Sequence, residues 1–233
     1  EWGIGGRSHR RGLERAVTAV RHGTVSRARQ CLTASPLAPL TDPTFRELTD
    51  PSKRPPRLLE AIDPASLAFQ PEEEVCLDAA IFSTCLRSAN RGVAGGTAGS
   101  KNEHFKVVLD DEVTTNLLHA AATRLARAQL PAEVSDPLAL ARLTALAKPN
   151  GRVRGIATGD TFRRLVARTL ARQFAGDFGR ACEPFQFALS TRAGTDSLTH
   201  MLRFLTDRDP WATISMIDGI GAYDHVRRSR MLG

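Results

Sequence analysis

This 233-residue chain has little cysteine, few aromatic residues and no long apolar run. Its four cysteines lie far apart, with no Cys-x-x-Cys pair and no neighbouring histidine, which argues against a zinc site and a disulfide framework and favours a reducing compartment. No apolar run approaches the roughly 18 residues of a membrane-spanning helix, and no secretory signal is visible. The composition predicts a globular protein of the nucleus or cytoplasm with no membrane partner.

Positive charge is in excess, with a net charge of +7, and it is unevenly spread. Residues 1–57 hold 11 Lys/Arg against 5 Asp/Glu, and residues 142–172 hold 8 basic residues and one acid. A compact basic block inside a folded region suggests a polyanionic partner such as a nucleic acid. A solvated basic helix face explains the same composition, so composition alone leaves both interpretations open.

The first half of the chain predicts helices separated by two irregular passages. Residues 11–34 predict two short helices broken at Gly23, and the prolines between positions 36 and 64 predict an extended linker that lies over another part or is disordered. A helix is expected from near Pro71 to about Asn90, followed by a flexible glycine-rich loop over 91–100. Helices over 102–109 and 111–129 and a turn between Pro131 and Pro137 complete this half.

A basic hairpin and a basic helix follow. Pro149-Asn150-Gly151 between two apolar, extended segments is a strong hairpin signal, and the hairpin would carry Lys148, Arg152 and Arg154. Asp160 is the expected N-cap of a helix that runs to about Phe178. On a helical wheel the arginines occupy the face opposite the apolar residues, and these are Arg163, Arg164, Arg168 and Arg172. Such clustered cations suit phosphate contacts. A further helix is expected over about 195–206.

The last 22 residues contain the stretch with the most evident chemistry. The apolar run 212–217 predicts a buried strand that ends at Asp218, on a turn punctuated by glycines. Tyr223, the single tyrosine of the chain, and Asp224 follow shortly after. A carboxylate at a strand tip suits a metal site, although Asp218 as a helix-capping residue explains the stretch on its own. For Asp224 we prefer the capping role.

Taken in order, these segments resemble a reverse transcriptase of the type encoded by non-LTR retrotransposons and group II introns. Residues 91–106 resemble its glycine-rich motif and the Glu-x-Phe pair that follows, and residues 148–156 are similar to its K-P-x-G…R-P-I fingertip hairpin, with Gly155 in place of the usual proline. Residues 186–196 resemble the segment before the palm, with Ala188 where glycine is common, and residues 218–224 resemble the first palm motif, D-x-x-x-A-[F/Y]-D.

The resemblance implies a role for each matching residue. Asp218 would bind the catalytic Mg²⁺ ions, of which the intact enzyme uses two, and the Gly219 carbonyl would complete the ligand set. Tyr223 would pack against the nucleotide sugar, and Lys148 and Arg154 would hold the triphosphate of the incoming dNTP. Contacts with the RNA template and DNA primer would come from the remaining basic and polar residues, namely Arg152, Arg163, Arg164, Arg168, Arg172, Gln186 and Arg192.

The fold expected is α+β, with mostly helical fingers, one β-hairpin, and the first strand and helix of a right-hand polymerase palm. The predicted divisions are an N-terminal helical extension with a Pro-rich linker (1–90), reverse transcriptase fingers (91–210) and the start of a palm (211–233). The aromatic-x-Asp-Asp motif that supplies the other metal carboxylates is absent from the sequence, so the chain is expected to be a fragment that is inactive alone. The alternative is a catalytically dead, nucleic-acid-binding relic. Template, target site, an associated nuclease domain and oligomeric state are not predicted.

Overall fold

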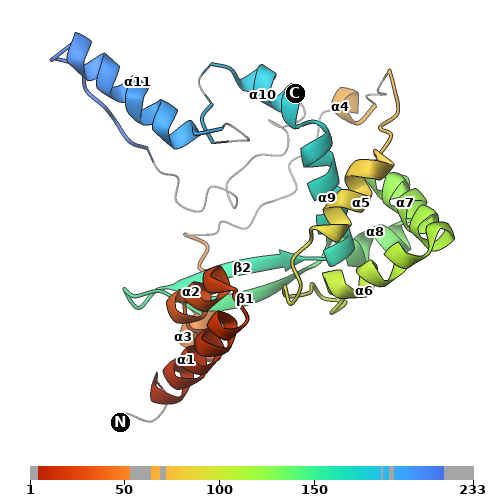
Figure 1. The fold of residues 1–233 in the computed structure, drawn as a ribbon, viewed down its shortest axis with the longest axis horizontal. Coiled ribbons are helices and arrows are strands. Elements are labelled where there is room, and N and C mark those ends of the chain that lie inside the picture. Colours follow the sequence, from red (N-terminus) through yellow and green to blue (C-terminus); the bar gives the residue numbers. More distant parts are fainter. Residues whose placement is uncertain (1–4, 53–63, 69–71, 185, 189–191, 218–233) are drawn as a thin grey trace. The chain divides into compact units, whose positions relative to one another are not determined.

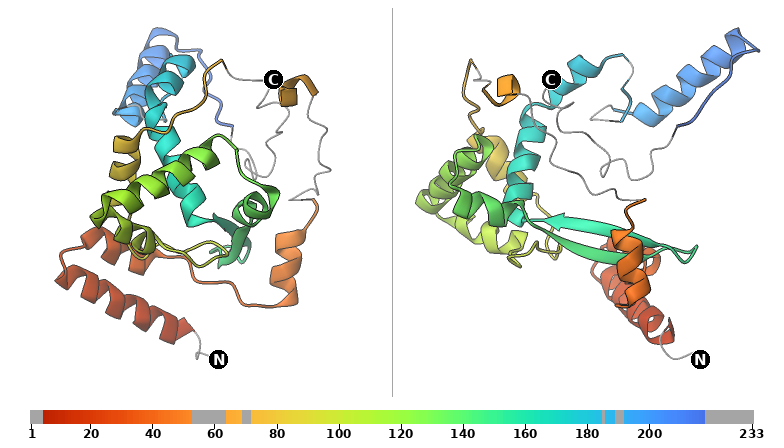
Figure 2. Two further views of the ribbon diagram at one scale, coloured as in Figure 1. Left: turned by 90° about the vertical axis from the view of Figure 1, so that its right-hand side faces the viewer. Right: turned by 180° about the vertical axis from the view of Figure 1, so that it is seen from behind.

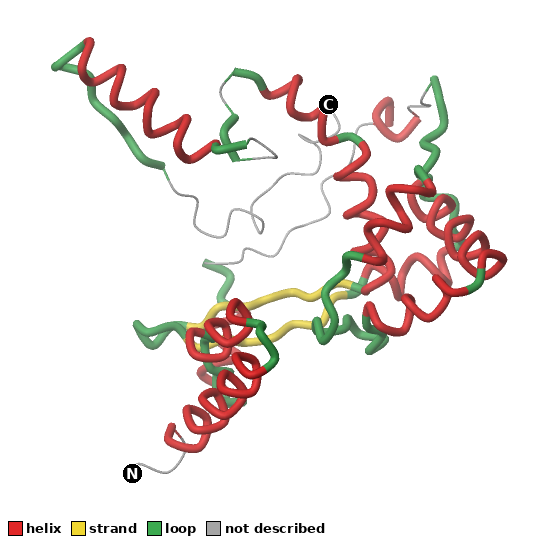
Figure 3. The backbone as a smooth tube through the Cα atoms, viewed as in Figure 1, coloured by secondary structure: helices red, strands yellow, loops and turns green. Residues whose placement is uncertain are grey.

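The computed structural model describes residues 5–52, 64–68, 72–184, 186–188 and 192–217, and its contacts divide the chain into two compact units. The first unit joins residues 1–58 with 143–157, and the second joins 59–142 with 158–233. The described residues are mostly helical with one two-stranded sheet, which agrees with an α+β class (Figures 1 and 3). The contact units do not follow the sequence-based divisions at 90 and 210, which remain predictions.

The first unit contains a helical hairpin of α1 (Gly5–Arg21) and α2 (Val25–Thr33), with α3 (Asp42–Thr49) after it. Ala16, Ala19 and Ala28 are buried between α1 and α2, where such small side chains allow the helices to approach closely. Gly23 lies at the turn with a φ of +70°, a left-handed conformation that glycine adopts without strain. This confirms the two predicted helices broken at Gly23.

Strands β1 (Ala141–Ala147) and β2 (Val153–Gly159) form the predicted hairpin. The Pro-rich passage pairs with the outer edge of β1: the Ala38 N–H donates to the Ala145 carbonyl at 3.0 Å, and the Ala147 N–H donates to the Pro36 carbonyl at 2.9 Å. Proline suits this edge position because its missing N–H is not needed there. The passage therefore lies extended against the sheet at this point. Of the two predicted alternatives, an extended linker over another part of the chain or disorder, the first is the one found here.

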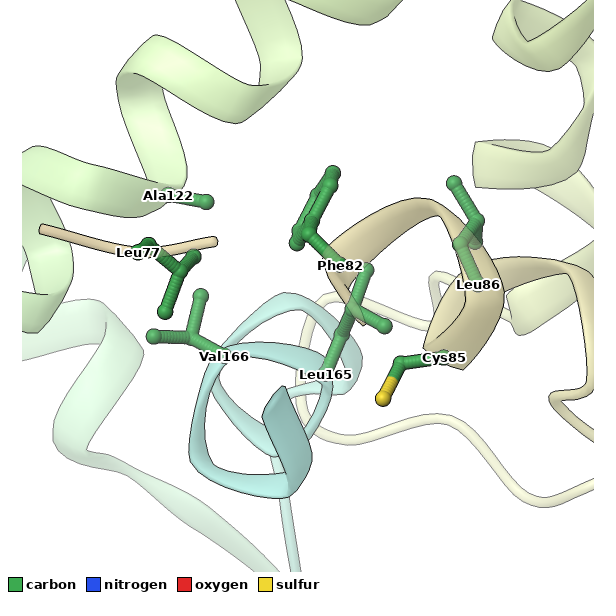
Figure 4. Packing of buried hydrophobic residues seen from close by; sticks show 7 residues of the cluster. All are labelled: Leu77, Phe82, Cys85, Leu86, Ala122, Leu165 and Val166. Atoms are coloured by element: carbon green, nitrogen blue, oxygen red, sulfur yellow. The ribbon is translucent and has the colours of Figure 1, made fainter. Parts of the chain in front are cut away.

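The second unit holds the larger apolar core. Its helices are α4 (Pro64–Ala68), α5 (Ala79–Arg87), α6 (Asn102–Lys106), the 3-10 helix η1 (Val107–Asp110), α7 (Glu112–Ala126), α8 (Ala132–Ala139), α9 (Thr161–Gln173), α10 (Ala175–Cys182) and α11 (Gly194–Arg208). Figure 4 shows Phe82 and Leu86 of α5 beside Leu165 and Val166 of α9, with Ala122 of α7 across from them. Helices α5, α7 and α9 remain together in both views of Figure 2, so α9 is anchored by its apolar face.

The predicted helix from Pro71 to Asn90 is wrong in its first half, because residues 74–78 have no regular secondary structure and α5 begins only at Ala79. Asp78 caps α5 by accepting a hydrogen bond from the Ile81 N–H at 2.7 Å. Side chains from other helices hold the backbone before it. The His119 Nε2 lies 2.6 Å from the Leu77 carbonyl, the Gln173 Nε2 donates to the Cys76 carbonyl at 2.8 Å, and the Arg127 Nε donates to the Val75 carbonyl at 2.8 Å.

Three further predictions need correction. Residues 132–139 form α8, with Pro137 in its last turn, where a turn was expected. The helix from Thr161 to Phe178 is divided into α9 and α10 at Phe174, whose φ of −99° departs from helical geometry. Residues 212–217 form no strand and are exposed, with Met216 at 96% and Ile217 at 95% of full exposure, because no described segment supplies the hydrogen bonds of a neighbouring strand.

Within the described part of the chain, no helix has both the length and the apolar character needed to cross a membrane.

Candidate nucleic-acid interface

The turn of the β-hairpin is tightly defined. The Lys148 N–H donates to the Arg152 carbonyl at 2.8 Å, and the Gly151 N–H donates back to the Lys148 carbonyl at 3.0 Å. Together with the φ of +76° at Gly151, this is the pattern of a type I turn followed by a glycine bulge, a common three-residue hairpin loop. The Asn150 side chain also accepts a hydrogen bond from the Arg152 N–H at 3.2 Å. The sequence Pro-Asn-Gly therefore forms the hairpin predicted from it.

The three cations of the hairpin differ in their surroundings. Lys148 is half-buried, whereas Arg152 and Arg154 are exposed. Arg152 is held by Glu47 of α3, with its Nε 3.4 Å from the Glu47 Oε1. Arg154 has no hydrogen bond or ion pair with any described residue, so its guanidinium is the one most available to an added phosphate.

Helix α9 has the predicted amphipathic character. Its N-cap is Asp160, which is buried and accepts hydrogen bonds from the Phe162 N–H at 2.8 Å and the Arg163 N–H at 3.4 Å. The apolar residues Leu165 and Val166 are 4% and 3% exposed, because they pack into the core. Arg163, Arg168 and Arg172 are exposed and Arg164 is half-buried, as the helical wheel predicts.

Three of these four arginines already hold neighbouring backbone or side chains. The Arg163 Nη1 donates to the carbonyls of Leu138 and Ala139 at the end of α8, at 3.4 and 3.2 Å. The Arg168 Nη2 donates to the Ser88 Oγ at 3.4 Å, just after α5. Arg172 alone of the four has a guanidinium without a hydrogen bond to the rest of the described chain. The α9 arginine face therefore includes residues that brace the fold, which the wheel does not reveal.

Arg164 braces the glycine-rich loop over 91–100. Its Nη2 donates to the Ala94 carbonyl at 2.7 Å and lies 3.1 Å from the Thr161 Oγ1. The Thr161 hydroxyl in turn donates to the Ser100 carbonyl at 2.5 Å. Helix α9 thus contacts the loop near its middle and at its end, through side chains on its first turn.

The other side of the loop is held from α6. The Glu103 Oε1 accepts a hydrogen bond from the Gly92 N–H at 2.6 Å, and the Asn102 Nδ2 donates to the Asn90 carbonyl at 2.8 Å. The backbone N–H groups of Glu103 itself and then of Gly92 hold the pKa of the Glu103 carboxyl below its usual range. Glu103 belongs to the Glu-x-Phe pair noted in the sequence, and this loop contact is its role in the structure.

Gly96 allows the loop to lie directly against the start of α9, and Gly95 allows the loop to fold closely on its own backbone at Ser100. A Cβ added at Gly96 would lie 2.8 Å from both the Asp160 Cα and the Gly159 carbonyl oxygen, and one at Gly95 would lie 2.5 Å from the Ser100 carbonyl oxygen. These are backbone atoms, which cannot move aside as a flexible side chain would. The loop is therefore packed against the N-terminus of α9, which corrects the expectation of a flexible loop.

The remaining predicted site residues are less closely integrated or lie outside the described residues. Gln186 is half-buried and its Oε1 accepts a hydrogen bond from the Ala188 N–H, while Arg192 is exposed before α11. Asp218, Gly219 and Tyr223 lie outside the described residues, as does Asp224. Among residues that are described, no three His, Cys, Asp or Glu side chains gather closely enough to hold a metal ion. The predicted metal ligands thus remain a prediction from sequence.

Sequence reasoning missed the roles of Glu103 and Arg164 in holding the loop and of His119, Arg127 and Gln173 in holding residues 74–78. Each of these contacts joins residues at least 11 positions apart, and most join residues more than 40 apart. A local pattern carries no signal for such pairs. The Glu-x-Phe spacing was the single signal present, and it indicated the residue but not the partner.

No family model, no curated protein and no solved structure matches this chain.

Proposed function

We propose that this chain is the fingers region and first palm motif of an RNA-directed DNA polymerase from a retroelement. In the intact protein this enzyme would add dNTPs to a DNA primer on an RNA template by two-metal phosphoryl transfer. The observation that carries the proposal is the hairpin over 141–159, whose turn places Lys148 and Arg152 as a hydrogen-bonded pair and leaves Arg154 exposed without a partner. An unpaired arginine on a short, rigid hairpin suits the triphosphate of an incoming nucleotide.

The glycine-rich loop supports the same proposal. It lies in the position of the chain where the family has a glycine-rich motif, and two charged side chains hold it, Glu103 from α6 and Arg164 from α9. A substrate-binding loop must keep its shape before the ligand arrives, since preorganisation reduces the entropy lost on binding. We assign Glu103 and Arg164 to this supporting role, and Arg172 and Arg192 to contacts with the template or primer.

The donor set predicted at the palm motif suits Mg²⁺, because the Asp218 carboxylate and the Gly219 carbonyl both offer the hard oxygen atoms that this ion prefers. When bound, the two ions would activate the 3′-hydroxyl of the primer and neutralise charge that develops on the phosphates. Tyr223 would contact the sugar of the nucleotide. One carboxylate cannot hold two metal ions, and these 233 residues contain no aromatic-x-Asp-Asp sequence. The proposed activity therefore requires an intact protein that supplies this motif.

The hairpin assignment is tested by comparing Arg154→Gln with Arg152→Gln in the intact polymerase. Both variants lose one positive charge on the same hairpin, but only Arg154 lacks a partner. Arg154→Gln is expected to raise the KM for dNTP about tenfold or more, since a charge-assisted phosphate contact contributes about 1.5–3 kcal/mol. Arg152→Gln should change the KM for dNTP by no more than about twofold, which is well below the effect expected from the loss of a charge-assisted phosphate contact. Equal effects of the two variants would contradict the assignment. RNA binding without any nucleotide incorporation would favour the catalytically dead relic.

A further inference from the structure

The two units differ sharply in charge. The described residues of the first unit, 5–52 and 143–157, hold 11 Lys/Arg and 4 Asp/Glu, a net charge of +7. The described residues of the second unit hold 15 Lys/Arg and 16 Asp/Glu, a net charge of −1. The excess positive charge of the described chain thus lies in the unit that contains α1 and α2, although α9 with its four arginines belongs to the other.

The arginine side chains on the helices of the first unit also make fewer hydrogen bonds within the protein than those of α9. The guanidinium groups of four exposed arginines on its helices have no hydrogen bond or ion pair to any described residue, and these are Arg15, Arg21, Arg29 and Arg46. On α9, by contrast, Arg163, Arg164 and Arg168 are bonded to backbone carbonyls or hydroxyls. A guanidinium without a partner loses no existing contact when it binds a phosphate. In the first unit such arginines coincide with the net positive charge, so this unit offers the stronger surface for a polyanion.

The packing of α1 on α2 creates a place for such a phosphate. A cavity of about 370 Å³ lies beside the turn between the two helices and is lined by Arg15, Thr18, Ala19, His22, Thr24 and Cys31. Arg15 and Thr18 share one face of α1, and His22 follows directly after the last residue of the helix. Both threonine hydroxyls already donate to backbone carbonyls, which leaves Arg15 and His22 as the donors for a bound anion.

The helical hairpin is built so that its large side chains remain outside. Alanines fill the contact between α1 and α2, and a Cβ added at Gly12 would lie only 3.1 Å from the Cys31 carbonyl oxygen. Close backbone approach through small residues makes a compact two-helix element, and its arginines cannot be buried between the helices. We propose that the α1–α2 hairpin is the principal RNA-backbone contact of this chain, with Arg15 and His22 at a phosphate and Arg21 and Arg29 beside it.

This inference rests on the proposed function for the identity of the polyanion, an RNA strand. An anionic membrane would offer the same charge complementarity. The described side chains of α1 and α2 expose Leu13, Val17 and Leu32 but no Trp or Phe, so the choice of RNA follows from the proposed function and vesicle binding is an outcome of the test. The inference goes beyond the proposed function because residues 1–90 match no motif of the family. It also moves the main RNA contact away from the arginine face of α9.

The experiment compares two triple variants of the 233-residue chain that lose the same charge. Arg15→Gln/Arg21→Gln/Arg29→Gln removes cations from α1 and α2, and Arg124→Gln/Arg203→Gln/Arg208→Gln removes three exposed cations from α7 and α11 of the second unit. Glutamine keeps helix propensity close to that of arginine, so both variants should fold, as circular dichroism would verify. The probe is a fluorescent single-stranded 20-nucleotide RNA, and its affinity is measured by anisotropy across a series of KCl concentrations.

The α1–α2 variant should weaken RNA binding about tenfold or more near 0.1 M salt and lower the slope of log K against log [salt] by about 2, since each lost phosphate contact removes about 0.7 from the slope. The control should keep the slope of the unmodified chain. Equal losses in the two variants, or no loss in the first, would overturn the inference while leaving the proposed polymerase function intact. Two other results would also overturn the inference. One is that the unmodified chain binds DNA of the same sequence more tightly than the RNA. The other is that the α1–α2 variant loses binding to phosphatidylserine vesicles while it keeps its affinity for RNA.

Discussion

Replacement of Gly96 by alanine tests whether the glycine-rich loop is packed against α9. The added Cβ would lie 2.8 Å from the Asp160 Cα, 2.8 Å from the Gly159 carbonyl oxygen and 2.9 Å from the Asp160 nitrogen. Contacts under 3.0 Å require movement, and here the atoms that must move are the backbone at the N-cap of α9. Overpacking of this kind costs about 1–3 kcal/mol, and we expect the upper half of that range because no flexible side chain can yield.

The matched control is Gly179→Ala. Gly179 lies inside α10, where an added Cβ would meet nothing within 4 Å. Alanine there should raise stability by about 0.5–1 kcal/mol, since glycine inside a helix is less favourable by that amount.

The assay is thermal unfolding followed by circular dichroism at the helical band. For a chain of this size 1 kcal/mol shifts the Tm by about 2–4 °C, so Gly96→Ala should lower the transition of the second unit by about 4–12 °C. Gly179→Ala should raise it slightly. If Gly96→Ala melts at the temperature of the unmodified chain, the loop does not lie against α9, and the supporting roles of Glu103 and Arg164 lose their basis.

Three further predictions follow from contacts in the second unit. Because hydrogen bonds lower the pKa of the Glu103 carboxyl, its contribution to stability is present above the ordinary carboxyl pKa and is lost as the pH falls through the lowered pKa. Hydrogen exchange at the Gly92 amide should therefore become faster in acid, and Glu103→Gln should remove that pH dependence. Asp160→Ala should cost about 1–2 kcal/mol in urea unfolding through the lost N-cap of α9, whereas a neutral result would contradict the capping role. Arg127→Met should expose residues 74–78 to limited proteolysis, and an unchanged cleavage pattern would show that the Val75 carbonyl contact does not hold this segment.

The elements that could be predicted from sequence are those defined by local chemistry. Pro149-Asn150-Gly151 contains both the proline that starts the turn and the glycine that takes a positive φ, and the hairpin forms there. Asp160 stands directly before an apolar–basic periodicity, and it caps α9. In both cases the determining residues lie within a few positions of each other, so a single-sequence pattern is sufficient.

The parts that could not be predicted depend on distant partners. The three glutamates at 72–74 suggested a helix start, but the backbone that follows them is held without regular secondary structure by His119, Arg127 and Gln173, which lie about 40 to 100 positions away. The apolar run at 212–217 satisfies a strand pattern, yet a strand needs a neighbour for its hydrogen bonds, and the described residues offer none. Pattern gives the preference of a segment, whereas its partners decide the outcome.

The candidate site also has a part that the sequence predicted and a part that only the structure reveals. The residue types and their order identified Lys148, Arg154 and the α9 arginines, and the structure describes each of them. It also separates Arg154 and Arg172, which have no partner in the described chain, from Arg163, Arg164 and Arg168, which brace neighbouring segments. A helical wheel cannot make that distinction, because it places side chains on a face without showing what the face meets.

The proposed polymerase function is tested most directly by primer extension with the intact protein, with Asp218→Ala as the matched variant. The account predicts Mg²⁺-dependent incorporation of dNTPs on an RNA template by the unmodified protein. It also predicts a loss of at least about 10³-fold in Asp218→Ala with RNA binding retained, since removal of a metal ligand removes charge stabilisation worth several kcal/mol in the transition state. Incorporation that survives Asp218→Ala, or a protein with an aromatic-x-Asp-Asp motif that incorporates nothing, would contradict it.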